Sequence, residues 1–140
     1  MRKATEGTHC CTYIKWFDMQ HPAYSDYLHH LANEGKRSPR TGAYLKAMGM
    51  RRGYPDYFLG IPAGDWYGMY LEMKKPDEKN KKLPAHQVTM LKKLARMGYY
   101  VYVAYSATDA IEITDLYLKH PSNVPVITFV DDKQVRNARE

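Results

Sequence analysis

The sequence has few of the residues that stabilise secreted or membrane proteins. Its two cysteines, Cys10 and Cys11, are adjacent, and neighbours in sequence rarely reach the geometry of an ordinary disulfide. No second Cys/His pair at zinc-ligand spacing follows His9. No stretch approaches the ~18 apolar residues that cross a bilayer, and no apolar run follows the charged N-terminus. We therefore expect a cytoplasmic protein with reduced thiols and no membrane anchor.

Phenylalanine is also scarce, and acids are outnumbered by cations. The chain has 3 Phe against 13 Tyr, so most of its rings carry a polar rim that suits a wet partner. Lys and Arg number 21 against 15 Asp and Glu, a formal charge of +6. This charge favours a polyanion, because each neutralised phosphate releases counterions. Nucleic acid is the leading partner, and a basic protein that is merely soluble is the alternative.

The spacing of apolar residues changes between helical and strand periods along the chain. With 140 residues, we expect a single domain. The pattern predicts helices over residues 6–20, 41–48, 84–96 and 111–119 and strands over 27–33, 56–60, 67–74 and 99–105. Thr108 and Asp109 are the expected cap of the last helix. The two middle strands form a hairpin, and the helix after them permits a right-handed crossover to a parallel strand. The order predicts a mixed α/β sandwich.

The C-terminal residues 121–140 form an expected tail. Within it, residues 124–130 are apolar and β-prone. Such a run either covers the sheet edge of its own subunit or pairs with another chain. We predict an extra strand or a dimer contact here.

Three charged residues converge on the predicted hairpin. Glu72 and Lys74 are two residues apart on one strand and therefore project from the same face. If the hairpin is centred on Gly64, Asp56 lies opposite Glu72, where two carboxylates repel unless a cation lies between them. Mg²⁺ or Mn²⁺ would suit these carboxylates together with the backbone carbonyl of Met73 and waters. The alternative is a salt-bridged hairpin with solvated charges.

Such a site would support hydrolysis of a phosphodiester. Lys74 would orient or deprotonate a water for in-line attack, and the 3′ oxygen would leave. Lysine and metal together would stabilise the charge that develops on the phosphorus.

Several short blocks carry a resemblance to a known family. They are residues 33–38 (NEGKRS), 45–56 (LKAMGMRRGYPD) and 68–75 (GMYLEMKK), followed by Gln87 and by Gly98 with Tyr99. In this order and spacing they closely resemble the stand-alone phage and bacterial VRR-NUC nucleases of the PD-(D/E)XK superfamily. The resemblance runs from near Glu6 to about Lys119. It implies a restriction-endonuclease-like α/β core, a mixed sheet flanked by helices, within residues 1–120.

The resemblance also implies roles for particular residues. Asp56 and Glu72 would bind the metal, Lys74 would be the catalytic lysine, and Gln87 would support the site or touch the phosphate backbone. Glu6 matches by position a glutamate that family members carry on the first helix. Two departures stand beside these matches. Cys10 occupies the place where the family has glutamine, and Glu34 stands where a small residue is usual, as an accessory ligand or a turn residue.

A basic stretch leads into the predicted site. Its cations are Lys36, Arg37, Arg40, Lys46, Arg51 and Arg52, and no acid lies between Glu34 and Asp56. We predict a phosphate-binding wall, to which Lys75 adds a backbone contact; a solvated face is the alternative. Of the histidines His29 and His30, alternation sends only one toward the site.

These observations predict a metal-dependent, structure-selective DNA endonuclease. Stand-alone relatives resemble Holliday-junction resolvases acting as homodimers, and twofold symmetry would place two sites on the two related strands. A flap or duplex DNA endonuclease is the alternative enzyme. A non-catalytic DNA-binding module is the alternative outside enzymes.

Overall fold

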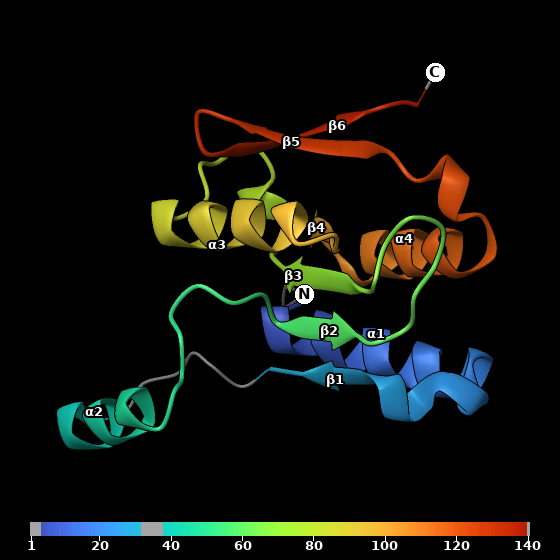
Figure 1. Cartoon of the computed structure of the whole chain (residues 1–140). Coiled ribbons are helices and arrows are strands. Elements are labelled where there is room, and N and C mark those ends of the chain that lie inside the picture. The colour runs from blue at the N-terminus through green and yellow to red at the C-terminus, as the bar shows by residue number, and fades with distance from the viewer. Residues whose placement is uncertain (1–3, 32–37, 140) are drawn as a thin grey trace.

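A four-stranded mixed sheet forms the centre of the computed structural model, which describes residues 4–31 and 38–139 (Figure 1). Its strands are β1 (Leu28–His30), β2 (Tyr57–Leu59), β3 (Met69–Met73) and β4 (Tyr100–Ala104), in that spatial order. Neighbouring strands are antiparallel from β1 to β3, and β4 is parallel to β3. The predicted hairpin and the predicted parallel pair are therefore confirmed.

One face of the sheet is covered by two helices, α1 (Glu6–Gln20) and α4 (Ala107–Lys119). Met69, Leu71 and Met73 alternate along β3 and point into this core, where they meet Tyr13 and Phe17 of α1. Several tyrosines serve this core rather than a wet partner, because their hydroxyls are bonded inside the protein. The hydroxyl of Tyr13, for example, lies 2.7 Å from that of Thr114.

The opposite face of the sheet is only partly covered. Helix α3 (Ala85–Arg96) packs its apolar side, including Val88 and Leu91, on Val101 and Val103 of β4. In Figure 1, α3 lies over β4, whereas the ribbons of β2 and β1 are left uncovered on this side. The face that carries Glu72 is therefore half open.

The remaining helices are short or exposed. They are α2 (Pro39–Ala47), which buries none of its residues, and the 3-10 helices Pro22–Tyr27, Pro76–Glu78 and Pro121–Asn123. The 3-10 helix Pro22–Tyr27 includes the first residue of the strand predicted over 27–33, so that β1 begins at Leu28. Residues 32 and 33 of that prediction lie outside the described residues. No helix in the described ranges is long and apolar enough to cross a membrane.

The cap predicted for the last helix is wrong. The N-cap of α4 is Ser106, whose Oγ accepts a hydrogen bond from the backbone N–H of Asp109 at 3.0 Å. Asp109 instead accepts from the Tyr102 hydroxyl and the Tyr105 N–H. Its carboxylate is thus used to join β4 to α4, which leaves the capping position to the serine.

The tail folds back on its own subunit as a hairpin of β5 (Val126–Val130) and β6 (Lys133–Asn137). Asp131 and Asp132 form its turn, with φ of 51° and 59°. Gln134 accepts from the N–H of Val103 and donates to its carbonyl, at 2.7 and 2.9 Å. Arg136 adds an ion pair to Asp109 at 2.6 Å. The tail therefore covers the outer edge of β4, the first of the two roles considered for it.

Candidate active site

Asp56 and Glu72 meet where β2 begins and β3 ends. Tyr57 pairs with Leu71, so the same register, continued by one residue, puts Asp56 opposite Glu72. This is the register of a hairpin centred on Gly64. Lys74 follows directly after β3 and lies on the side of Glu72. The structure thus brings these three residues together.

The carboxylate of Asp56 is held by the backbone of the neighbouring strand. Its Oδ2 accepts a hydrogen bond from the N–H of Met73 at 2.8 Å. The segment before Asp56 is fixed as well, because Gly53 has φ of +88° and a Cβ there would lie 2.7 Å from the carbonyl oxygen of His86. The approach to β2 is therefore packed against the first turn of α3.

Glu72 is a buried acid, with only 4% of its surface exposed. Lys74 Nζ lies 3.9 Å from its Oε2, and most of the Lys74 side chain is itself buried. Burying a carboxylate and an ammonium is costly in desolvation, so this pair does not follow from a need for stability alone. Buried ionisable groups of this kind are characteristic of sites that do chemistry.

Gln87 lies in the first turn of α3 and is 5% exposed. Within the described part of the chain, no hydrogen-bond donor reaches its buried Oε1. A buried amide oxygen without a donor costs roughly 1–3 kcal/mol. The Gln87 side chain thus lies inside the protein and not on the solvent face of the helix, as a residue that supports the site must.

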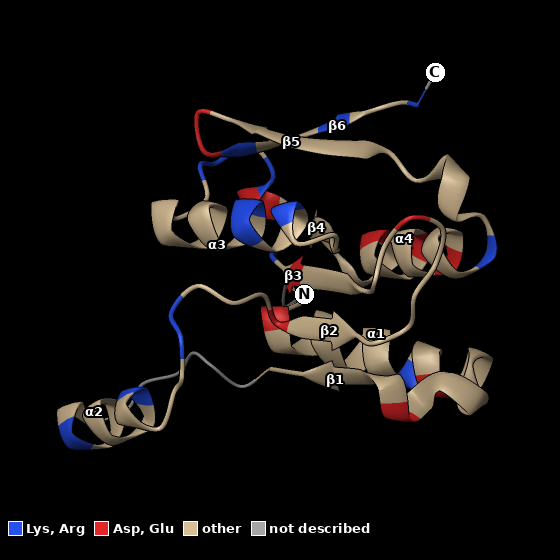
Figure 2. Cartoon of the chain, viewed as in Figure 1, with Lys and Arg blue, Asp and Glu red and all other residues tan. Residues whose placement is uncertain are grey.

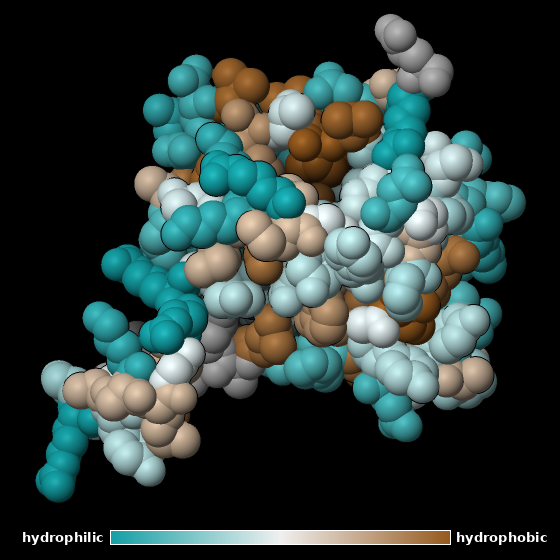
Figure 3. Space-filling model, in the orientation of Figure 1, coloured by the Kyte–Doolittle hydropathy of each residue, from teal (hydrophilic) through white to brown (hydrophobic). Residues whose placement is uncertain are grey.

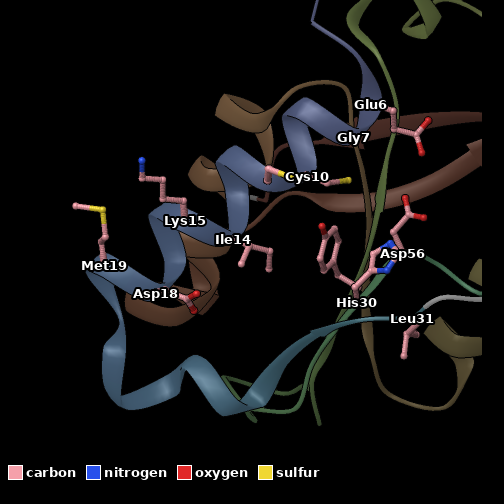
Figure 4. A pocket seen from close by; sticks show the side chains of 12 residues that line it. Glu6, Gly7, Cys10, Ile14, Lys15, Asp18, Met19, His30, Leu31 and Asp56 are labelled. Carbon is pink, nitrogen blue, oxygen red and sulfur yellow. The ribbon is translucent and has the colours of Figure 1, made fainter.

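Glu6 lies at the start of α1, where Thr5 caps the helix. Burial raises the pKa of its carboxyl, as does the charge of Asp56, while Lys74 lowers it. Figure 4 shows the Glu6 and Asp56 side chains at the same end of a pocket. Glu6 therefore belongs to the neighbourhood of the site, and Cys10 lines the same pocket one turn further along α1.

The acidic residues fit Mg²⁺ or Mn²⁺ better than zinc. Among the residues that the structure describes, no group of three or more His, Cys, Asp and Glu side chains could hold a metal. Mg²⁺ needs fewer protein side chains as ligands, because one or two carboxylates together with carbonyl oxygens and waters are enough. Asp56 and Glu72 supply those carboxylates, and the Gln87 Oε1 is a buried polar atom to which the described residues donate no hydrogen bond. The Met73 carbonyl and Glu6 stay predicted as further ligands.

The predicted phosphate-binding cations lie on the segment of the chain that leads to Asp56. Arg40 and Lys46 are exposed on α2, and Arg51 and Arg52 are exposed in the loop after it. Figure 2 shows these cations leading to acidic residues at the start of α1 and the end of β3. Lys75 is exposed just beyond Lys74. Lys36, Arg37 and Glu34 lie outside the described residues.

The rings of the two histidines of β1 point to opposite faces of the sheet, as predicted. His30 lines the pocket beside Asp56, and its ring packs on Tyr57. His29 packs instead on Phe58.

Sequence reasoning missed the pocket itself. It has a volume of about 820 Å³ and lies between α1 and the start of β2, with Ile14, Met19 and Leu31 among its apolar lining. Ile14 and Met19 lie in the helical pattern of α1, which predicts an ordinary core face. Nothing in that pattern distinguishes a residue that lines a cavity from one that fills a core.

Solved structures that resemble this chain were found by comparison. A solved structure described as a "VRR_NUC domain protein" aligns with a TM-score of 0.70 and 29% sequence identity, over 85% of this chain and 92% of that chain. No protein-family model and no curated protein matches the sequence.

Proposed function

Because the chain has the fold of a VRR-NUC domain, an α/β fold of the PD-(D/E)XK type, we propose that it is a metal-dependent endodeoxyribonuclease. One observation carries the proposal. Asp56 and the buried Glu72 lie opposite each other, with the Lys74 ammonium 3.9 Å from the Glu72 carboxylate. A DNA-binding module without catalysis gains nothing from carboxylates that would repel phosphates, so this arrangement favours the enzyme.

Asp56 and Glu72 would hold the metal ion, with its remaining positions open to water and phosphate. A bound Mg²⁺ or Mn²⁺ supplies positive charge that stabilises the phosphoryl transition state and makes water a better nucleophile. The hydrogen bond from Met73 keeps one Asp56 oxygen in place for this task. The role of the two carboxylates is thus to hold the metal ion in a fixed position. The hydrogen bond to Asp56 orients its carboxylate before substrate binds.

Lys74 would act on the attacking water. As an ammonium, its Nζ would orient the water; as a neutral amine, it would accept the proton of the water. The water oxygen bonds to phosphorus, the bond from phosphorus to the 3′ oxygen breaks, and that oxygen takes up a proton from solvent. The products are a 5′ phosphate and a 3′ hydroxyl. Gln87, buried on the same side of the sheet, would steady this arrangement through its amide.

The DNA backbone would run along the basic stretch. Arg40, Lys46, Arg51, Arg52 and Lys75 are exposed on the approach to the carboxylates, and Lys36 and Arg37 belong to the same run of sequence. Cations at this spacing position phosphates without reading sequence. A structure-selective enzyme therefore suits the site better than a sequence-specific one.

Four-way junctions cut by a homodimer are the first substrate that we propose, with flap and duplex DNA as the alternatives. The homodimer is supported by the outer side of β5, where Val126 and Val130 are 44% and 57% exposed. Figure 3 shows hydrophobic surface over the β5–β6 hairpin. Exposed apolar strand residues favour association with a second copy.

The test is cleavage of labelled DNA. Duplex, flap and four-way junction substrates are incubated with the protein in Mg²⁺, Mn²⁺ or EDTA. We expect cutting in either metal and none in EDTA, with a branched substrate preferred. Equal cutting in EDTA would exclude the metal-dependent mechanism, and binding without cutting of any substrate would favour the DNA-binding module.

A further inference from the structure

A row of aromatic side chains lies on the half-open face of the sheet. The row consists of Tyr54, Phe58, Tyr70, Tyr99 and Tyr67, and we call it the aromatic strip. Its ring centroids are 4.5 Å apart for Phe58 and Tyr70, 6.1 Å for Tyr54 and Tyr70, and 5.2 Å for Tyr70 and Tyr99. All five are at least partly exposed. Rings packed at such distances form a continuous surface rather than isolated contacts.

Two glycines leave room for this surface. A Cβ at Gly68 would lie 3.0 Å from the Phe58 ring, and one at Gly60 would lie 3.3 Å from it. The Phe58 ring therefore packs closely against two positions that carry no side chain. A side chain at either position would displace the ring from the strip.

The strip borders a hollow of about 350 Å³. Its lining includes Arg51, Tyr54, Phe58 and Tyr70, with Leu31, Gly49 and Met50 completing it. This volume is at the lower end of those that hold small organic ligands. The hollow is thus lined by aromatic rings and by a guanidinium. Aromatic rings can stack on a planar base, and the guanidinium can bind the phosphate attached to it.

The hollow lies one step along the sheet from the catalytic carboxylates. Tyr70 precedes Glu72 by two residues on β3, and Phe58 follows Asp56 by two residues. Residues two apart on a strand share a face and are separated by about 6.6 Å. That is close to the spacing of successive nucleotides in an extended strand. A base in the hollow would therefore belong to the nucleotide next to the one being cut.

We propose that the aromatic strip binds unpaired bases of the DNA strand beside the cleavage site, with one base in the hollow and Arg51 at its phosphate. The proposal rests on the proposed nuclease function and specifies its substrate: branched DNA with a single-stranded segment at the branch. Bases of an intact duplex are stacked on each other and offer no open face to a ring. Of the proposed substrates, a flap carries such a segment along its whole single strand, whereas a four-way junction offers one only where base pairs open at the branch point.

Binding in EDTA tests this inference separately from catalysis. The affinity of the wild-type protein is measured for a fluorescent oligothymidylate, for an abasic strand of the same length and for a duplex. We expect the abasic strand to bind about ten-fold more weakly than oligothymidylate, because its phosphates remain but its stacking is lost. Equal affinity for the two strands would overturn the proposal, whether or not the protein cuts DNA.

Leucine variants locate the stacking surface. Tyr54→Leu and Tyr70→Leu keep apolar volume and remove the ring, and each should weaken oligothymidylate binding about ten-fold with little effect on the duplex. Tyr70→Phe should retain wild-type affinity. Tyr24→Leu, at an exposed tyrosine stacked on His21, is the matched control and should change nothing. Leucine variants that bind oligothymidylate as tightly as the wild type would overturn the proposal.

Discussion

The Asp56 carboxylate is hydrogen-bonded to the Met73 backbone, at 2.8 Å between Oδ2 and the amide nitrogen. This bond joins the start of β2 to the end of β3 beside Glu72. It fixes one oxygen of Asp56 against the strand, so the carboxylate does not have to find its orientation when metal or phosphate binds.

Asp56→Asn should remove cleavage and preserve the fold. The amide oxygen of asparagine can still accept from Met73, but the charge that would hold a divalent ion is lost. We expect cleavage to fall by at least about 100-fold, with DNA binding unchanged or tighter because repulsion of phosphate is reduced. Glu72→Gln should behave in the same way. Full turnover in either variant would contradict the assignment of the metal site.

Lys74→Met should abolish cutting at saturating metal. Methionine keeps the apolar stem and removes the ammonium 3.9 Å from Glu72. Single-turnover rates and thermal melting would be compared with those of Lys79→Met, an exposed lysine in the loop beyond β3. Unchanged turnover in Lys74→Met would mean that the lysine only neutralises Glu72.

Replacing Arg51 and Arg52 with alanine should weaken DNA binding and reduce its salt dependence. Each lost phosphate contact should lower the slope of log affinity against log salt concentration by about one unit. Lys119, which pairs with Asp115 on α4, provides the control Lys119→Ala. A slope that stays the same would identify the basic loop as a solvated surface.

Glu6→Gln should stabilise the metal-free protein at neutral pH. Burial and the neighbouring Asp56 charge raise the pKa of Glu6, so its ionised form opposes folding. A raised pKa in the folded state means that this group favours folding at low pH and loses that contribution as pH rises through the folded pKa. The gain in Tm should therefore be present at pH 7 and vanish in acid. A gain of equal size at both pH values would point to packing instead of charge.

Val126→Lys with Val130→Lys should dissociate a homodimer and keep the subunit folded. Both residues are exposed on β5, whereas the bonds from Gln134 and Arg136 that dock the hairpin are on β6. Light scattering at micromolar concentration, with and without junction DNA, measures the change in mass. A wild-type protein that is monomeric in both conditions would remove the case for a symmetric resolvase. Truncation near Lys119 is a poorer test, because it would expose the outer edge of β4.

The central hairpin and its three charges could be predicted from local sequence. Alternation along 67–74 determines that Glu72 and Lys74 share a face, and the position of Gly64 determines the register with Asp56. Helices α1 and α3 were equally predictable from the spacing of their apolar residues. Pro84 marks the start of α3, and Pro22 marks the end of α1. These features depend on neighbours within one hairpin or one helix.

Tertiary structure alone decided the surroundings of the site. The strand β6 has little apolar alternation and forms because it pairs with β5 and its Gln134 and Arg136 bind Val103. The proximity of Glu6 to Asp56 depends on how α1 packs across the sheet. The aromatic strip stays partly exposed because the core under α3 is formed mainly with β4. A sequence pattern records which face of an element is apolar. Which distant element covers that face, and how much of it, is decided only when the whole chain packs.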